Sequence, residues 1–146
     1  MAVRDAVPAD LPHIASLVRE LGAYERLSDE VVFDEAEMGR WLFGTAPAAR
    51  VLVATGGDDE VVGMALYHGT FSTFLGRPGI WLEDLFVRPA ARGRGHGRAL
   101  LETLMQRTPG RLEWAVLDWN QPAIDFYRRL GARPVEGWSR WRWTAG

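Results

Sequence analysis

The sequence predicts a mixed α/β (α+β) fold in which helices cover both faces of one β-sheet. Four segments carry apolar residues at helical spacing, and six shorter segments carry the alternating or continuous apolar residues of strands. Their order is β-α-α-β-β-β-α-β-α-β, so strands alternate with helices only in the second half, which favours a mixed sheet. The length suits one domain with a real core, and we expect residues 1–146 to form it.

The first half of the chain contains most of the predicted strands. We expect, in order, a strand at 2–6, helices at 8–25 and 34–44, and strands at 50–55, 60–71 and 80–87. Asp34 and Glu37 have the spacing of a capping box at the start of the second helix. The last of these strands, IWLEDLFV, is mostly apolar, which is typical of a strand in the middle of a sheet.

The second half begins with a glycine-rich segment that leads into an amphipathic helix. The apolar face of this helix carries Leu100, Leu101, Leu104 and Met105. The helix is expected to end at TPG (108–110) and to be followed by a strand at 111–119. The next helix begins at Pro122 and has Gly131 as the residue after its C-cap. The alternating WSRWRW at 138–143 predicts a last strand, with its tryptophans in the core or in a dimer interface.

The composition argues against several classes of protein. The net charge is −2 and cysteine is absent, so we expect no nucleic-acid partner, no disulfide, no thiolate metal site and no cysteine nucleophile. There is no run of about 18 apolar residues and no signal-peptide pattern, so we expect no membrane partner and a cytoplasmic location. The histidines lack metal-site spacing. The chain has no lysine, and a Walker A phosphate loop requires one.

A basic island interrupts this acidic chain at VRPAARGRGHGR (87–98). It holds four of the 17 basic residues, which leaves 13 basic residues against 19 acidic ones elsewhere. The segment could be a phosphate-binding loop, a nucleic-acid-binding patch or a flexible loop without a ligand. Its glycines lack the G-x-G-x-x-G spacing of a dinucleotide site, and no aromatic residues separate its arginines. Its position between a strand and a helix N-terminus favours an anion site, with pyrophosphate as the natural ligand.

The segment Arg92 to Gly97 (RGRGHG) resembles the Q/R-x-x-G-x-G/A signature of the GNAT superfamily of N-acetyltransferases, which binds the pyrophosphate of acetyl-CoA. WLEDLFVRPAARGRGHGRALL and AVLDWNQPAIDFYRRLGA resemble segments of the diamine (spermidine/spermine) and thialysine N-acetyltransferases, and so do LGAYERL and EGW. The resemblance covers nearly the whole chain. It implies a twisted, mainly antiparallel sheet of about six to seven strands with about four helices. It also implies acetyl-CoA as the cosubstrate and a homodimer.

The resemblance further implies which residues bind acetyl-CoA. The backbone of Leu85, Phe86 and Val87 would contact the pantetheine arm and polarise the acetyl carbonyl, as on the bulged strand of the family. The implied phosphate loop consists of Arg92, Gly93, Arg94, Gly95, His96, Gly97 and Arg98. Further implied contacts come from Asn120, Ala123 and Tyr127. Asn120 also has the position of a helix N-cap.

Acetyl transfer to an amine requires a base, because an alkylammonium with a pKa of about 10.4 is not a nucleophile at neutral pH. By resemblance Glu83 is this base, acting through water, and Tyr127 protonates the leaving thiolate. The residue pattern alone also allows a solvated acidic pair at a sheet edge for Glu83 and Asp84, and a core tyrosine for Tyr127. We expect Glu83 and Asp84 to face opposite sides, because neighbouring strand residues alternate.

The resemblance implies a small cationic acceptor, either a polyamine or a lysine- or thialysine-like amino acid. The residues implied to line its site are Tyr24, Glu25, Glu83, Asp84, Glu113, Trp114, Ala115 and Glu136. Carboxylates would attract a cationic amine, although an isolated glutamate is ordinarily solvent-exposed. Two alternatives stay open. One is acetylation of a protein, a peptide or another amine such as an antibiotic, and the other is a non-catalytic acyl-CoA-binding module.

Overall fold

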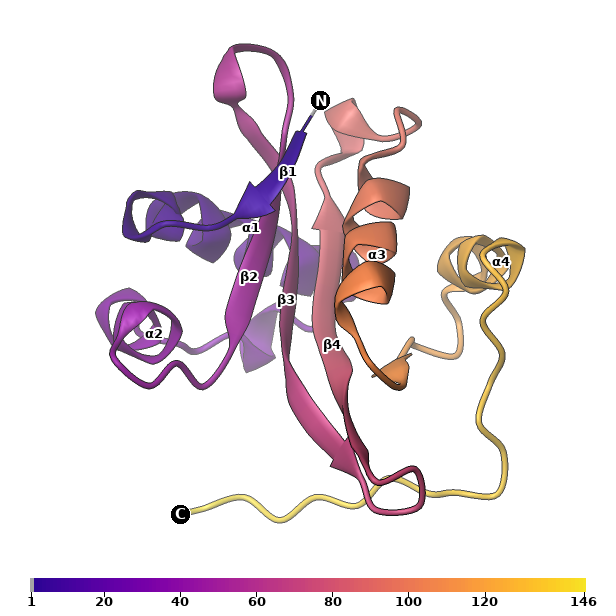
Figure 1. Cartoon of the computed structure of the whole chain (residues 1–146). Helices are drawn as coiled ribbons and strands as arrows, with labels where there is room; N and C mark the ends of the chain where they lie inside the picture. Colours follow the sequence, from indigo (N-terminus) through magenta and orange to yellow (C-terminus); the bar gives the residue numbers. More distant parts are fainter. Residues whose placement is uncertain (1) are drawn as a thin grey trace. The chain divides into compact units, whose positions relative to one another are not determined.

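The computed structural model describes residues 2–146, which divide into two compact units. The boundary between them in the chain follows Ala115. The first unit contains one sheet and three α-helices (Figure 1). Its strands are β1 (Ala2–Asp5), β2 (Arg50–Thr55), β3 (Val61–Ser72), β4 (Arg77–Val87) and β5 (Leu112–Trp114). Its helices are α1 (Leu11–Tyr24), α2 (Glu35–Phe43) and α3 (His96–Arg107). The second unit contains α4 (Gln121–Arg129).

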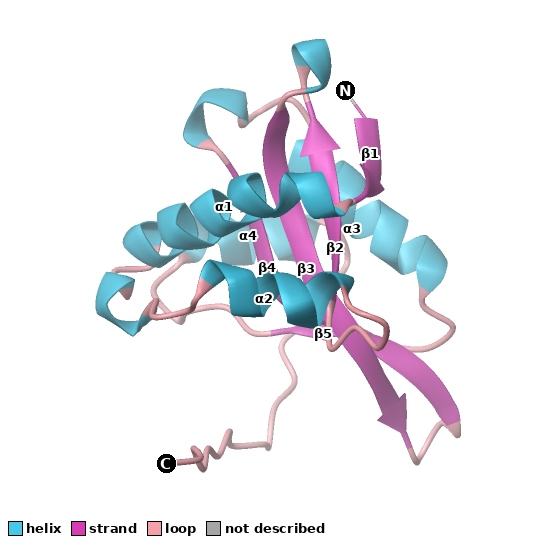
Figure 2. Cartoon of the chain, turned by 90° about the vertical axis from the view of Figure 1, so that its left-hand side faces the viewer, coloured by secondary structure: helices cyan, strands magenta, loops and turns pink. Residues whose placement is uncertain are grey.

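The sheet is mixed and mainly antiparallel. Its strand order is β1-β2-β3-β4-β5, and the first four strands pair antiparallel, whereas β5 is parallel to β4. Helices α1 and α2 cover one face and α3 covers the other (Figures 1 and 2). The predicted class, a mixed sheet with helices on both faces, is therefore confirmed. The apolar segment IWLEDLFV lies in β4, which has a neighbouring strand on each side.

Apolar side chains fix the helices to both faces of the sheet. On the α1–α2 face, Ile14 and Leu17 pack in one buried cluster with Met64 of β3 and Phe86 of β4. On the other face, α3 buries Leu100, Leu101 and Leu104 completely. Each fully buried side chain of this kind contributes about 1.5–3 kcal/mol of transfer free energy. The two layers therefore hold β3 and β4 in place, and β4 is the strand that carries the site described below.

The second unit is built around α4, and both ends of this helix are capped as the sequence predicts. The side-chain oxygen of Asn120 accepts a hydrogen bond from the Ala123 N–H at 3.4 Å. Gly131 follows the C-cap with a φ of +90°. The N–H of Ala132 then donates to the carbonyl of Tyr127 at 3.1 Å. This is a Schellman motif, which favours glycine because the backbone must adopt a positive φ.

The expected count of about six to seven strands was wrong, because residues 2–146 form five. The strand expected at 111–119 is limited to β5, since the chain leaves β4 after Trp114. The segment expected as a last strand, 138–143, is extended but unpaired, and its tryptophans are between 81% and 89% exposed. Alternating Trp and Arg predicts a two-faced segment, but a strand also needs a neighbour, which local sequence does not specify.

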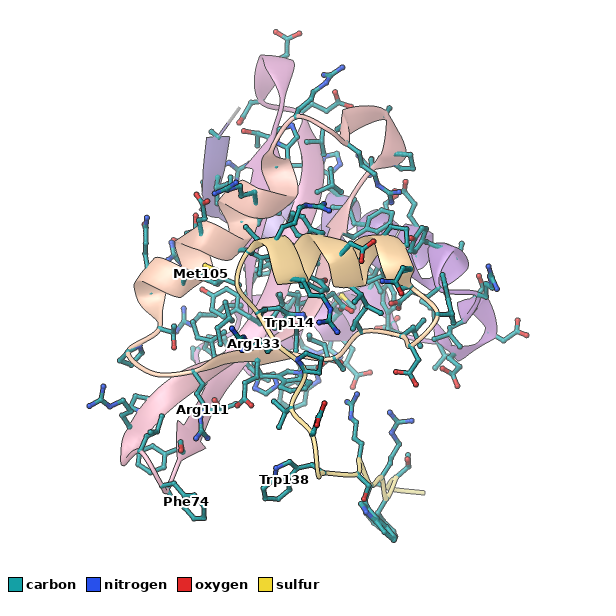
Figure 3. The ribbon with its side chains drawn as sticks, turned by 90° about the vertical axis from the view of Figure 1, so that its right-hand side faces the viewer. Phe74, Met105, Arg111, Trp114, Arg133 and Trp138 are labelled. Carbon is teal, nitrogen blue, oxygen red and sulfur yellow. The ribbon has the colours of Figure 1, made fainter. Side chains whose placement is uncertain are left out.

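Leu104→Ala should lower the free energy of unfolding by about 2–5 kcal/mol, because it removes a fully buried side chain and leaves a cavity between α3 and the sheet. Met105→Ala, on the same helix, should cost less than about 1 kcal/mol, since the side chain is already partly in solvent (Figure 3). Urea unfolding followed by circular dichroism measures both values. Equal losses for the two variants would contradict the orientation of α3.

Candidate active site

Strand β4 contains a β-bulge at Glu83. Its register with β3 pairs Asp84 with Leu66 but Leu82 with Tyr67, so Glu83 is an extra residue on β4. Side chains alternate along a regular strand, and the extra residue resets this alternation. Glu83 and Asp84 therefore both lie on the face that α1 and α2 cover. The expectation that these two carboxylates face opposite sides was wrong for this reason.

Beyond the bulge, β4 also loses its neighbour β5, which pairs with it only along Ile80–Leu82. The N–H of Arg88 donates to the carbonyl of Val62 on β3 at 2.8 Å. Arg88 therefore directs its backbone groups towards β3, and along an antiparallel pair every second residue does the same. By alternation, Leu85 and Val87 direct their N–H and C=O groups away from β3. These backbone groups lie at an edge that β5 does not cover, where an extended ligand can bind them.

The glycine-rich segment forms a turn that ends at the N-terminus of α3. Gly93 and Gly95 have φ values of +79° and +85°. A Cβ at either residue would meet no atom within 4 Å, so glycine is required for its backbone conformation and not for space. The first N–H groups of a helix have no partner within the helix and carry a partial positive charge. The turn therefore fits an anion such as a diphosphate.

The arginines of this segment differ in what they contact. The guanidinium carbon of Arg92 lies 5.2 Å from the centroid of the Tyr24 ring. Its Nε donates to the carbonyl of Val87 at 2.8 Å. Arg98 pairs with Glu102 one turn further along α3, at 2.6 Å. Both side chains are thus already engaged with protein groups. Arg94 is exposed within the turn, so its guanidinium and the backbone of the turn are the features that fit phosphate.

His96, the first residue of α3, is buried and not directed to solvent. Its side chain is 4% exposed, and among the described residues its Nδ1 has no hydrogen-bond partner. Burial lowers the pKa of His96, which favours the neutral ring. The predicted contribution of His96 to phosphate binding is therefore confined to its backbone N–H.

Three carboxylates gather on the α1–α2 face of β4. The pKa of Asp84 is raised to about 6, first by burial and then by the negative charges of Glu83 and Glu25. Burial also raises the pKa of Glu25, the residue that caps the C-terminus of α1. Tyr24 precedes it, with its ring 6.5 Å from that of Phe86. The structure thus brings four predicted acceptor residues together, and their clustered negative charge favours binding of a cation.

Trp81 is a residue of this site that the sequence analysis missed. Its indole N–H donates to Oε2 of Glu83 at 2.9 Å. The signal was present in WLED, because residues two positions apart on a strand lie on the same face. The charge of Glu83 marks it as a candidate in the sequence, whereas a tryptophan in an apolar strand is by default a packing residue.

The remaining predicted residues of the first unit lie on or beside β5. Glu113 and Trp114 pair with Trp81 and Leu82, the last positions of β4 before the bulge. The side chain of Trp114 is labelled in Figure 3. Ala115 follows directly and is exposed. Glu113, opposite Trp81, therefore lies on the face of the carboxylate cluster, whereas Trp114, opposite Leu82, lies on the α3 face. The contacts of Glu113, Trp114 and Ala115 with an amine stay predictions.

The other predicted residues belong to the second unit. Asn120 is buried and caps α4, which confirms its N-cap role. Tyr127 is half-buried, with its ring 5.5 Å from that of Phe126, as expected of a packed tyrosine. Glu136 is exposed in the segment after α4. Two sets of contacts stay predictions. Asn120, Ala123 and Tyr127 would contact acetyl-CoA, and Glu136 would contact the amine.

Two further searches concern metals and membranes. Among residues 2–146, no group of three or more acidic or histidine side chains is placed to hold a metal ion. Within the same residues, no helix combines the length and the apolar character needed to cross a bilayer.

Comparison with known proteins identifies the class of this fold and site. Residues 16–132 match the acetyltransferase (GNAT) family. The thialysine N-epsilon-acetyltransferase of Bos taurus is 38% identical over 154 residues, which cover 96% of this chain and 90% of that protein. The chain therefore belongs to the GNAT family, and it is an acetyltransferase.

Two more similarities agree with this assignment. The spermidine/spermine N(1)-acetyltransferase-like protein 1 of Homo sapiens is 31% identical, over 97% of this chain and 22% of that protein. An integron cassette protein of V. cholerae shares the fold with a TM-score of 0.79 and 24% identity, over 99% of this chain and 92% of the other. The recognised resemblance to the diamine and thialysine branch is thus confirmed.

Asp84→Asn should stabilise the protein at neutral pH but not in acid. The folded protein keeps a proton on Asp84 up to about pH 6, whereas the unfolded chain releases it near the ordinary value of 3.8. The free energy of unfolding therefore falls as the pH rises through this window, by about 2–3 kcal/mol. The asparagine variant does not suffer this loss. Urea unfolding at about pH 4 and about pH 7.5 compares the two proteins.

Asp29→Asn, at an exposed aspartate, serves as the control for this prediction. It should change the free energy of unfolding by less than about 0.5 kcal/mol at either pH. A gain for Asp84→Asn that is equal at both pH values would show that burial of the charged carboxylate is not its cause.

Proposed function

We propose that this protein transfers the acetyl group of acetyl-CoA to a primary amine of a small cationic acceptor, either a polyamine or a lysine- or thialysine-like amino acid. The observation that carries this proposal is the carboxylate cluster of Glu25, Glu83 and Asp84, at the start of the β4 edge that leads into the phosphate-binding turn. The relatives are named for thialysine and for spermidine/spermine, and both names denote small amines.

The chain's residues fit acetyl-CoA at two consecutive places. The N–H groups of the turn from Gly93 to Gly97 would bind the diphosphate at the N-terminus of α3. The outward N–H groups of Leu85 and Val87 and the C=O of Leu85 would pair with the amides of the pantetheine arm, as with an added strand, whereas the C=O of Val87 already accepts from Arg92. When bound, acetyl-CoA supplies an activated acetyl group. A backbone N–H at the bulged edge would donate to its carbonyl oxygen as negative charge develops there.

The carboxylate cluster would serve the amine in two ways. Its charge would attract the ammonium form of the acceptor. Glu83 would then take up the ammonium proton through water, since its exposed side chain at the bulge is accessible to solvent. Asp84 is more buried, and its role would be to bind the cation.

Bond formation between the amine nitrogen and the acetyl carbon would break the carbon–sulfur bond. The Tyr127 hydroxyl would give its proton to the thiolate that leaves, so that free CoA is released as a thiol. The second proton, which the nitrogen loses as the amide forms, would return to Tyr127 through solvent. The chain has no cysteine that could hold the acetyl group as a second thioester. Direct transfer in a complex of protein, acetyl-CoA and amine is therefore the simplest path.

We place this activity in a cytoplasmic homodimer. The exposed tryptophans of the C-terminal segment, Trp138, Trp141 and Trp143, support an interface between two copies. Large apolar side chains that cluster in one segment are usually covered in the working form of a soluble protein.

A thiol-release assay with a panel of amines tests the proposed function. The panel contains spermidine, thialysine, lysine, an aminoglycoside and a lysine-containing peptide. We expect turnover with at least one of the first three, with a kcat/KM at least about tenfold higher than for the peptide, because the carboxylate cluster fits a small cation. If the protein binds acetyl-CoA but acetylates none of the small amines, the proposed acceptor class is wrong.

Tyr127→Phe should lower kcat by about 100-fold or more, because it removes the proposed proton donor and keeps the ring. The Kd of acetyl-CoA, measured by calorimetry, should change by less than about threefold, since one hydroxyl contact contributes little to so large a ligand. Tyr67→Phe is the matched control, because Tyr67 lies on the α3 face, where its hydroxyl accepts from Arg107. An unchanged kcat for Tyr127→Phe would remove Tyr127 from the mechanism.

A further inference from the structure

We propose that Trp81 is a positioning residue for Glu83, and that its indole N–H holds the carboxylate in the orientation in which it receives the amine proton. The inference rests on the proposed function, since it assumes that Glu83 is the base. Its direct observation is the hydrogen bond of 2.9 Å from the indole nitrogen to Oε2 of Glu83. Side chains two positions apart on one strand meet on the same face, so the bond needs no distortion of the backbone.

Trp81 is held firmly, whereas the backbone of Glu83 is not. Trp81 is opposite His68 on β3 and Glu113 on β5, so it has strand neighbours on both sides. Glu83 comes two residues later, where the bulge removes its partner on β3 and where β5 no longer follows β4. Strand pairing therefore fixes Trp81, which donates the hydrogen bond, but not Glu83, which accepts it. A side-chain hydrogen bond from the fixed residue compensates for the missing pairing.

Repulsion within the carboxylate cluster makes such a bond necessary. Asp84 is the next residue and lies on the same face, so Glu83 would lower its energy by turning towards solvent and away from this like charge. Such a turn would remove it from the acceptor amine. The indole N–H opposes the turn by holding one carboxylate oxygen, and the other oxygen stays available for water or for the amine.

The chemistry of the donor also suits this role. An indole N–H donates a hydrogen bond but carries no charge. An arginine at the same place would orient the carboxylate too, but it would form an ion pair and compete with the ammonium group of the substrate. Tryptophan therefore orients the base and leaves its negative charge available to the acceptor.

A double-mutant cycle tests the inference, with kcat measured for the best amine of the panel. Trp81→Phe removes the N–H donor and keeps an aromatic ring. It should lower kcat about tenfold, the effect of losing a hydrogen bond to a charged group, and should leave the KM of acetyl-CoA within about twofold. In a Glu83→Gln background, Trp81→Phe should lower kcat by less than about twofold, because the group that it positions is already gone. Trp41→Phe on α2 is the matched control and should keep wild-type kinetics.

The indole N–H resonances of the intact protein give a readout that does not depend on the fold of a tryptophan variant. The chain has seven tryptophans. In a spectrum of ¹⁵N-labelled protein, Glu83→Gln should shift the indole resonance of Trp81, since the carboxylate it donates to becomes a neutral amide. The resonance of Trp41 should stay in place.

The outcomes separate the inference from the proposed function. If wild-type protein acetylates no amine, or if Glu83→Gln keeps full turnover, the proposed role of the base fails and the inference fails with it. If Glu83→Gln lowers kcat but Trp81→Phe does not, only the inference is overturned. The same holds if Trp81→Phe has an equal effect in both backgrounds, because that result indicates a packing role that is independent of Glu83.

Discussion

The active-site region depends on one constraint, the loss of strand partners along β4. The bulge removes the β3 partner of Glu83, and β5 stops following β4 after Leu82. Backbone groups that a regular sheet would use for its own pairing are therefore directed outwards at Leu85 and Val87. A buried backbone group without a partner is costly, so such an edge persists only where solvent or a ligand satisfies it. The bulge also places two carboxylates on one face, so the end of β5 and the bulge together create the two halves of the site.

Charge separates these halves. Directly after β4, the turn at Gly93–Gly97 offers N–H groups and the positive end of α3 to an anion, whereas the β4 bulge offers carboxylates to a cation. Arg92 lies between the two regions, donates to the Val87 carbonyl and stacks on Tyr24. The proposed anionic cosubstrate and cationic acceptor would therefore be attracted to neighbouring but distinct parts of the surface. Such binding would account for a basic island in a chain with net negative charge.

The sequence predicted those features that depend on neighbours along the chain. The helices followed from apolar spacing, Gly131 from the need for a positive φ, and the phosphate turn from glycines before a helix. The residues of β3 and β4 alone do not show the bulge at Glu83, because it is a property of the register between the two strands, and only the resemblance to the family implied a bulged strand. The strand expected at 138–143 failed for a related reason, since alternation specifies two faces but no partner. Trp81 is different, because the two-residue spacing in WLED already indicates that its side chain lies on the face of Glu83.

The raised pKa of Asp84 indicates what the carboxylate cluster is built to bind. Burial and like charges both make the ionised form of this residue unfavourable. A cation among the three carboxylates would offset the effect of the like charges, because attraction to an ammonium group would replace repulsion between anions. Binding of the proposed amine would thus recover part of the free energy that the burial of Asp84 costs the fold. Sites of this kind reduce stability in exchange for affinity, which is why a carboxylate in this position is better explained by an amine ligand than by the needs of the fold.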